Sequence, residues 1–246
     1  MNSRVILVSD DRSSLRSPDT LLWPDAACMR GIHTGEWTAH IFEYAMSFEG
    51  NMTQVRELAA ANGVGVLHPH GALATDPPGL IVCDVDSTVT RTEAIDLLAE
   101  CAGNADEVRE ITARAMVGEL DFTQSLYARV RCLEGLHIGA LEEAWKATVI
   151  TPGTAELVAA AHDVGAAVGL VSGGFTAIVD PLAEQIRADF AASNELEIVD
   201  NHLTGRVVGD IIDRAAKATW LRRWASERGV ALERTIALGD GANDLD

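Results

Sequence analysis

The chain has 246 residues (26.2 kDa), and 48% of them are apolar, which suffices for the core of one α/β domain with a small companion. Asp and Glu number 37 against 19 Lys and Arg, so the net charge of −18 disfavours nucleic acid and anionic membranes as partners. The sequence has no apolar run of about 18 residues, and its start, MNSRVILVSDDRSS, lacks the apolar stretch of a signal peptide. We therefore expect a cytoplasmic protein.

The cysteines are scattered along the chain without any CxxC pair. This spacing favours reduced core thiols over a disulfide framework or a structural zinc site; the four are Cys28, Cys83, Cys101 and Cys132. Lysine is rare, with only Lys146 and Lys217 against seventeen arginines. A lysine that falls within a motif is therefore a candidate functional residue.

The first 75 or so residues are predicted to form a small α+β module. Residues 37–48 show short alternations that suit strands, and residues 52–62 are typical of a helix closed by Gly63. Residues 68–79 carry three of the seven prolines and are the best linker candidate. His68 and His70 in this stretch could be metal ligands, but they lack cysteine or acidic companions, and a surface turn is the better interpretation.

Beyond this linker, short apolar strands alternate with helices, which is typical of a parallel sheet covered on both faces. The three clearest strands are residues 80–85, 166–171 and 235–238. Each runs into a polar turn: DSTVT, SGGF and GDGAND. Because ligands bind beyond the carboxyl ends of such strands, we expect the three turns to converge on one site.

About seventy residues separate the first two of these strands, which is too many for a simple crossover connection. They show helical periodicity and predict a helical cap over the site; the helices expected are 95–101, 106–116, 122–133 and 141–147. The predicted fold is α/β, with a Rossmann-like parallel sheet, a helical cap insertion at about 93–150 and the N-terminal α+β module. We expect the domain boundary at residues 79 and 80.

The first turn carries two aspartates, Asp84 and Asp86, in a DxDxT pattern. At a frayed strand end both can reach the crevice, one as nucleophile and metal ligand and the other as proton donor. Solvated acids at an exposed strand end are the alternative. An EF-hand calcium loop is excluded, since Val89 stands where glycine is needed and Ile95 where a bidentate glutamate is needed.

The second turn offers an anion cradle, because Ser172 supplies a hydroxyl and Gly173 permits close approach of the backbone. An ordinary strand-to-helix turn is the alternative, and no G-x-S-x-G or Walker A pattern is present. Lys217 lies in a predicted helix whose Leu221 and Trp224 face inward, and a solvated surface charge is the alternative interpretation of this lysine. The third turn, GDGAND at residues 239–244, concentrates oxygen ligands as a magnesium site requires.

Taken in this order, these motifs resemble those of the haloacid dehalogenase-like superfamily, and within it the phosphoserine phosphatase family. The resemblance is nearly continuous from Leu80 to Asp246. It rests on DVDSTVTRTE (84–93), MVGELDFTQSLYARV (116–130), VSGGF (171–175), SNELEIVD (193–200), LTGRVVGDIID (203–213), the helical Lys217 and GDGAND.

The resemblance implies Mg²⁺-dependent hydrolysis of O-phosphoserine to serine and phosphate, the last step of serine biosynthesis. Asp84 would attack phosphorus to give an aspartyl-phosphate, and Asp86 would protonate the seryl oxygen and later deprotonate water. Mg²⁺ would be held by the Asp84 carboxylate, the Asp86 main-chain carbonyl and Asp240. Asn243 and Asp244 would position nearby groups, with Asn243 contributing to substrate binding.

The substrate-binding residues follow from the same resemblance. Ser172, Gly173 and Lys217 would hold the phosphoryl oxygens. In the cap, Glu93 would receive the substrate ammonium and Arg129 its carboxylate, with Phe122 beside them. An arginine fork matches a carboxylate bidentately, and a glutamate suits an ammonium. The alternatives are a helix-start acid for Glu93 and a surface cation for Arg129.

The sequence departs from the family at both ends. The first 75 residues are only loosely similar to the N-terminal extensions of longer members, and the chain stops inside the last motif, where members continue through a further strand and helix. We therefore expect an incomplete scaffold. The alternatives are a related phosphatase or phosphotransferase acting on another small phosphomonoester, or an inactive ligand-binding chain. The expected partner is a small-molecule substrate, with no nucleic acid or membrane; the sequence does not indicate an oligomeric state.

Overall fold

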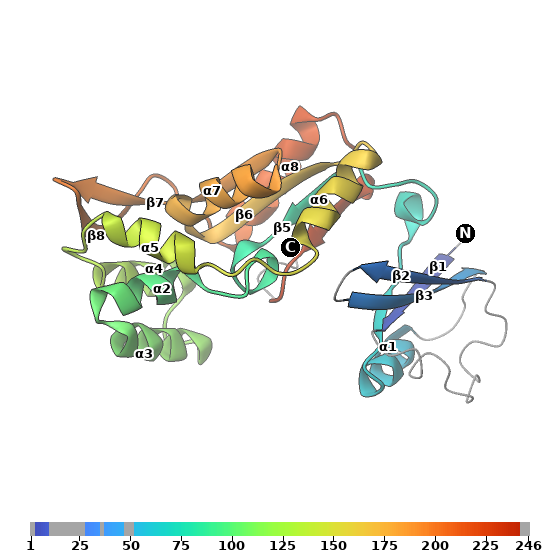
Figure 1. Ribbon diagram of the computed structural model, residues 1–246, viewed down its shortest axis with the longest axis horizontal. Helices are drawn as coiled ribbons and strands as arrows, with labels where there is room; N and C mark the ends of the chain where they lie inside the picture. Colours follow the sequence, from blue (N-terminus) through green and yellow to red (C-terminus); the bar gives the residue numbers. More distant parts are fainter. Residues whose placement is uncertain (1–2, 10–27, 35–36, 47–51, 242–246) are drawn as a thin grey trace. The chain divides into compact units, whose positions relative to one another are not determined.

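The computed structural model describes residues 3–9, 28–34, 37–46 and 52–241, and the chain divides into two compact units, Met1–Pro77 and Pro78–Asp246. Within its described residues, the first unit contains a four-stranded antiparallel sheet in the order β2-β3-β1-β4 and one α-helix (Figure 1). Its elements are β1 (Ser3–Ser9), β2 (Cys28–Thr34), β3 (Trp37–Met46), α1 (Met52–Ala61) and β4 (Gly65–Leu67). The predicted strand and helix of this module are confirmed, while Phe48 lies outside the described residues.

The predicted linker, residues 68–79, contains one short 3₁₀ helix, Gly71–Ala74. The boundary between the two units falls within it, at Pro77 and Pro78. The His68 and His70 rings lie 6.1 Å apart, and among the described residues no third His, Cys, Asp or Glu completes a metal site with them. The interpretation of this position as a surface turn stays a prediction.

The second unit is built on a five-stranded sheet in the order β8-β7-β6-β5-β9. Its strands are β5 (Leu80–Cys83), β6 (Ala167–Phe175), β7 (Phe190–Val199), β8 (His202–Val208) and β9 (Thr235–Leu238). Strands β7, β6, β5 and β9 run parallel to one another, and β8 pairs with β7 antiparallel as a hairpin. The three predicted strands are confirmed, but β5 ends two residues earlier than predicted and β6 continues four residues further.

Helices cover both faces of this sheet (Figure 1). On one face Ile81 and Cys83 of β5 pack with α6 (Thr154–Asp163) and α7 (Thr176–Ile186). On the other face Leu80 and Val82 pack with Trp224 of α8 (Arg214–Glu227). Because successive strand residues point to opposite faces, a strand buried on both sides has an uninterrupted apolar sequence. β5 therefore reads LIVC.

Four helices between β5 and β6 form the predicted cap. They are α2 (Ala94–Ala102), α3 (Ala105–Met116), α4 (Phe122–Arg131) and α5 (Gly139–Ala147). Their shared core includes Leu98, Leu126 and Val130, each at most 1% exposed. The two chain segments that lead into and out of the cap are bridged at Thr90 and Ile150. All four predicted cap helices are confirmed.

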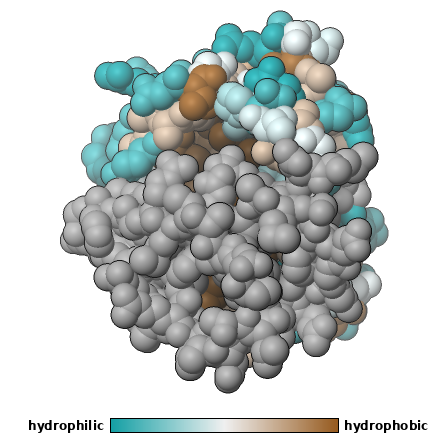
Figure 2. All heavy atoms as spheres, turned by 90° about the vertical axis from the view of Figure 1, so that its right-hand side faces the viewer, coloured by the Kyte–Doolittle hydropathy of each residue, from teal (hydrophilic) through white to brown (hydrophobic). Residues whose placement is uncertain are grey.

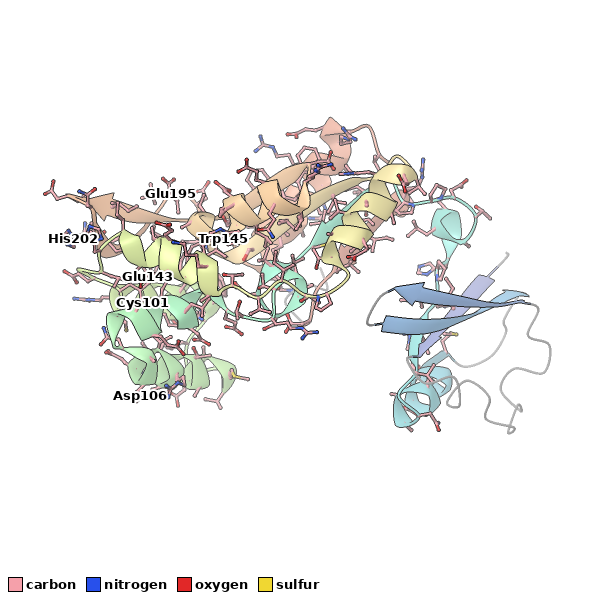
Figure 3. All side chains as sticks on the ribbon, viewed as in Figure 1. Cys101, Asp106, Glu143, Trp145, Glu195 and His202 are labelled. Atoms are coloured by element: carbon pink, nitrogen blue, oxygen red, sulfur yellow. The ribbon has the colours of Figure 1, made fainter. Side chains whose placement is uncertain are left out.

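The cap is also attached to the β7–β8 hairpin. Between α4 and α5, the Gly135 N–H donates to the Leu203 carbonyl and the Leu203 N–H donates to the Leu136 carbonyl, each at 2.8 Å. The His137 and His202 rings stack edge to face at the same place, and Figure 3 labels His202 on the hairpin. Trp145 of α5, labelled in the same figure, packs against both the cap core and the sheet core. This corner of the cap is thus fixed to the sheet.

In the view of Figure 2, the coloured residues are mostly hydrophilic, with isolated hydrophobic ones. No helix among the described residues combines the length and apolar character needed to cross a lipid bilayer. Cys83, Cys101 and Cys132 are free thiols, but Cys101 is exposed and Cys132 is half-buried, so the prediction of core thiols is confirmed only for Cys83. Burial raises the pKa of Cys83 to about 11. That thiol is a core group rather than a nucleophile.

Candidate active site

Asp84 and Lys217 form a buried ion pair at the carboxyl end of β5. The Lys217 Nζ lies 2.6 Å from Asp84 Oδ1, and the two side chains are 11% and 8% exposed. Lys217 is placed by the start of α8, where Asp213 Oδ1 accepts a hydrogen bond from the Ala216 N–H. The Asp84 N–H donates to the Leu238 carbonyl at 2.8 Å, which extends the pairing of β5 with β9. One carboxylate is thereby held beside a cation in a nearly dry site.

Asp86 lies in the tight turn after β5, in which Ser87 adopts a left-handed conformation with φ +58°. Asp86 Oδ1 accepts a hydrogen bond from the Ala94 N–H at 3.0 Å, and Oδ2 accepts one from Ser172 Oγ at 3.5 Å. Burial, assisted by the charge of Asp84, raises the pKa of Asp86 to about 6. A carboxyl group with this pKa can both donate and accept a proton near neutral pH.

The glycine turn at the end of β6 brings backbone against these acids. A Cβ at Gly174 would lie 2.6 Å from Asp86 Oδ2, and one at Gly173 would lie 2.7 Å from the Phe122 ring. Only glycine fits at either position without displacing a neighbour. Ser172 is fully buried, and its hydroxyl bonds with Gly174 and Asp86 behind the pocket wall. Gly173 and Gly174, by contrast, line the pocket itself.

The cap contributes one negatively charged and one positively charged side chain to the opposite wall of the pocket. Glu93 precedes α2, and its Oε1 accepts a hydrogen bond from Ser87 Oγ at 3.4 Å. Burial is the main cause that raises the pKa of Glu93, whereas the charge of Arg129 lowers it. Burial lowers the pKa of Arg129, and the nearby charge of Glu93 opposes that shift. The cap wall therefore carries two opposite charges within electrostatic reach of each other.

Local capping positions the aromatic residue of this wall. Asp121 and Gln124 form a capping box at the start of α4, with reciprocal hydrogen bonds of 2.8 and 3.0 Å. Phe122 is consequently the first residue of α4, and Arg129 follows two turns later on the same helix. Both side chains line the pocket. The predicted cap residues Glu93, Phe122 and Arg129 are thus brought together.

These groups enclose a pocket of about 290 Å³ between the cap and the sheet. Its lining includes five carboxylates and three cationic groups: Asp84, Asp86, Glu93, Asp213, Asp240, Arg129, Arg214 and Lys217. Apolar wall residues are Ile95, Phe122, Leu126, Phe175 and Ile212. Sequence reasoning missed the lining residues Ser87, Gly174, Asp213 and Arg214, as well as all of these apolar ones except Phe122. The position of Arg214, three residues before Lys217 on a helix, was a signal that could have identified it.

The three predicted metal ligands, Asp84, Asp86 and Asp240, line the same pocket. Asn243 and Asp244, which were predicted to position nearby groups, lie outside the described residues. Within residues 52–241, no three His, Cys, Asp or Glu side chains cluster tightly enough to hold a metal by themselves. The predicted set does not require such a cluster, because Asp86 would contribute its carbonyl oxygen. The excess of carboxylates over cations in the pocket suits a hard divalent cation.

A family model, haloacid dehalogenase-like hydrolase, matches residues 81–246. The chain is 51% identical over 188 residues to a phosphoserine phosphatase of Streptomyces coelicolor, covering 76% of this chain and 46% of that protein. It is 50% identical over 167 residues to a phosphoserine phosphatase of Streptococcus thermophilus, covering 68% of this chain and 78% of that protein. The chain thus spans less than half of the Streptomyces relative and most of the Streptococcus one.

Structural similarity agrees with these matches. The unliganded structure of a probable phosphoserine phosphatase from Vibrio cholerae superposes with a TM-score of 0.78 and 35% identity, covering 98% of this chain and 74% of that one. The matched residues 81–246 include every described side chain of the pocket. The chain therefore belongs to the haloacid dehalogenase-like hydrolases and, within them, to the phosphoserine phosphatase family.

Proposed function

We propose that this chain is a Mg²⁺-dependent phosphoserine phosphatase that works through an aspartyl-phosphate on Asp84, and that it catalyses the last step of serine biosynthesis. One observation carries the proposal: the buried Asp84–Lys217 pair, 2.6 Å apart, shares a pocket with the oppositely charged Glu93 and Arg129 of the cap. The first pair suits a phosphoryl group. The second pair suits the ammonium and carboxylate of an amino acid.

Two steps account for the hydrolysis. In the first, an Asp84 carboxylate oxygen forms a bond to phosphorus while the bond from phosphorus to the seryl oxygen breaks, and Asp86 gives its proton to that oxygen. In the second, the Asp86 carboxylate takes a proton from water as the water oxygen attacks phosphorus. The bond to Asp84 then breaks, and inorganic phosphate leaves. The raised pKa of Asp86, about 6, suits both roles.

The phosphoryl oxygens need donors during both steps. Lys217 supplies a cation beside Asp84, and the backbone at Gly173 is open to close approach because no Cβ intervenes. Ser172, also predicted for this group, is fully buried and does not line the pocket, and its hydroxyl donates to Asp86, so we assign it to holding the turn behind the phosphoryl site. Donors fixed in advance on β6 and α8 do not have to reorganise as charge develops on the phosphoryl group.

Recognition of the serine part is assigned to the cap. Glu93 is proposed to receive the ammonium and Arg129 the carboxylate, with Phe122 covering the apolar side. The 290 Å³ pocket is of a size that fits a small phosphomonoester. A zwitterion placed between Glu93 and Arg129 would pair its ammonium with the first and its carboxylate with the second.

Phosphoserine phosphatases of this superfamily are generally metal-dependent. We assign Mg²⁺ to the Asp84 carboxylate, the Asp86 carbonyl and Asp240, with Asn243 nearby as predicted. When bound, Mg²⁺ would offset the carboxylate excess of the pocket and draw charge from the phosphoryl oxygens. The phosphatase domain is assigned to residues 80–246, with the cap at about 93–150, and the division of the chain at Pro77 and Pro78 supports this boundary. The cytoplasmic location stays a prediction.

The test measures phosphate release from phosphoserine by this chain, with Mg²⁺ and with EDTA. We expect turnover only with Mg²⁺. We also expect a hydroxylamine-labile phosphoryl adduct on the wild-type protein that Asp84→Asn lacks. Parallel reactions with homoserine as acceptor and with other phosphomonoesters separate hydrolysis of phosphoserine from phosphotransfer and from other substrates. Substantial activity of Asp84→Asn, or Mg²⁺-independent turnover, would contradict the proposal.

A further inference from the structure

Asn194 on β7 is a buried polar residue that the proposed reaction does not use. Its side chain is 1% exposed and makes two hydrogen bonds to backbone groups. Nδ2 donates to the Gly173 carbonyl at 2.8 Å, and Oδ1 accepts from the Ile212 N–H at 2.9 Å. Gly173 and Ile212 both line the pocket. One amide therefore ties the glycine turn after β6 to the segment that leads into α8.

The chemistry of the two partners requires an amide at this position. A carbonyl needs a donor and an N–H needs an acceptor, and only an amide side chain offers both in one plane. Aspartate has the same shape but, when ionised, would direct a carboxylate oxygen at the Gly173 carbonyl. Because the site is dry, such an unmatched contact is costly. The Asn194 amide thus fixes how the Gly173 carbonyl points.

The orientation of this carbonyl is passed on to Asp86. The Gly173 C=O and the Gly174 N–H belong to one planar peptide unit and point in opposite directions. The Gly174 N–H donates to Ser172 Oγ at 2.8 Å, and Ser172 Oγ in turn donates to Asp86 Oδ2 at 3.5 Å. A hydroxyl that accepts a hydrogen bond becomes a better donor. A continuous chain of hydrogen bonds therefore runs from Asn194 to Asp86.

We propose that Asn194 is a positioning residue for Asp86, acting through the Gly173–Gly174 peptide and the Ser172 hydroxyl. The inference rests on the proposed function, in which Asp86 protonates the leaving oxygen. Asn194 touches neither substrate nor reacting atoms. Its effect is to hold the peptide plane so that the Ser172 proton is directed at Asp86 Oδ2 and the Asp86 carboxyl keeps one orientation.

The test compares Asn194→Asp with the matched control Thr176→Val. Thr176 Oγ1 donates to the backbone carbonyl of Asn194 at 2.9 Å, so the control removes a neighbouring hydrogen bond without touching the chain to Asp86. For Asn194→Asp we expect kcat on phosphoserine to fall about 10- to 100-fold, with KM within about twofold of wild type. The loss on p-nitrophenyl phosphate should be smaller, because a phenolate leaves without needing a proton. Thr176→Val should keep the wild-type kcat.

A double-mutant cycle with Ser172→Ala tests the proposed route. If Asn194 acts through Ser172, adding Asn194→Asp to Ser172→Ala lowers kcat by less than about threefold further. Losses that multiply, or equal losses on both substrates, would overturn the inference. Thermal melts check folding, and Asn194→Ala replaces Asn194→Asp in the same cycle if the aspartate variant melts well below wild type.

The variant Asp86→Asn separates this inference from the proposed function. If Asp86 is the acid, Asp86→Asn loses far more activity on phosphoserine than on p-nitrophenyl phosphate. Equal losses for Asp86→Asn on the two substrates would refute the acid role itself and, with it, the inference. If Asp86→Asn loses more activity on phosphoserine than on p-nitrophenyl phosphate, while Asn194→Asp loses equal activity on both, the positioning role of Asn194 is refuted and the acid role of Asp86 stands.

Discussion

Asp86 Oδ1 accepts a hydrogen bond from the N–H of Ala94, the first residue of cap helix α2, at 3.0 Å. The proposed acid and base is thus attached to the amino end of the cap, where the helix dipole favours negative charge. This bond lowers the pKa of Asp86, but burial has the larger effect and raises it to about 6. The contact couples the ionisation of Asp86 to the stability of the folded unit.

The first prediction concerns Asp86→Asn in metal-free protein. A pKa raised from 3.8 to about 6 on folding means that the protonated form favours the folded state. The contribution of Asp86 protonation to the free energy of unfolding is fully present below about pH 4, and it is lost as the pH rises through 6. Each pKa unit corresponds to about 1.4 kcal/mol, so the loss is on the order of 3 kcal/mol. Asparagine does not titrate, so this loss should be absent from the variant.

Urea unfolding in EDTA at pH 4 and at pH 7.5 measures this difference. We expect the free energy of unfolding of wild type, relative to that of Asp86→Asn, to decrease when the pH is raised from 4 to 7.5. Asp76→Asn is a suitable control, because Asp76 is an exposed acid within the linker. A wild type and an Asp86→Asn variant whose stabilities follow the same pH dependence would show that Asp86 has an ordinary pKa in the folded state.

The second prediction uses the two lysines. Lys217→Met removes the cation beside Asp84, and we expect kcat/KM for phosphoserine to fall by about 10²- to 10³-fold. The metal-free protein should also become less stable, because a buried carboxylate loses its partner. Lys146→Met is the control, since Lys146 pairs with Glu142 on the exposed face of α5. Comparable activity losses in the two variants would refute the role given to Lys217.

Much of this site could be predicted from sequence, because its acids and glycines directly follow buried apolar strands. Asp84, Asp86, Gly173 and Asp240 stand at strand ends, where a parallel sheet brings them to one edge. The end of β5 was predicted two residues late. Alternation and burial do not reveal that Ser87 adopts a left-handed conformation, which turns the chain away from the strand direction.

Other features depend on tertiary contacts that no local pattern specifies. The β7–β8 hairpin was not predicted, because the alternate buried residues of β7, from Ala192 to Leu196, include the polar Asn194 and so do not form an apolar alternation. Asn194 has no local signature, since both its partners are distant in the chain. The 2.7 Å approach that a Gly173 Cβ would make to Phe122 likewise requires the cap and the sheet to be assembled.

The third prediction concerns substrate recognition by the cap. We expect Arg129→Ala to raise KM for phosphoserine by roughly 10- to 100-fold, because a charge-assisted pair contributes about 1.5 to 3 kcal/mol. Hydrolysis of an aryl phosphate, which has no carboxylate, should hardly change. Arg131→Ala is the matched control, since Arg131 is exposed in the last turn of the same helix. Equal losses on both substrates would place Arg129 in the scaffold or at the phosphate.

The fourth prediction tests the attachment of the cap to the β7–β8 hairpin with two glycines. Gly205 has φ +75°, and a Cβ there would lie 3.0 Å from Glu134 Cβ and 3.3 Å from Arg131 Cα at the end of α4. Gly209 has nearly the same backbone, φ +77°, but nothing lies within 4 Å of its Cβ position. Alanine at either position costs about 1 to 2 kcal/mol of backbone strain. Only Gly205→Ala adds a clash with the cap.

We therefore expect Gly205→Ala to be less stable than Gly209→Ala by a further 1 to 3 kcal/mol, about the usual cost of overpacking. Because the backbone strain is shared, the difference between the two variants isolates the contact between cap and hairpin. Denaturant unfolding of both proteins measures it directly. Equal stabilities would mean that the end of α4 moves away from the hairpin at little cost, and the cap would then be held mainly by the bridged segments at Thr90 and Ile150.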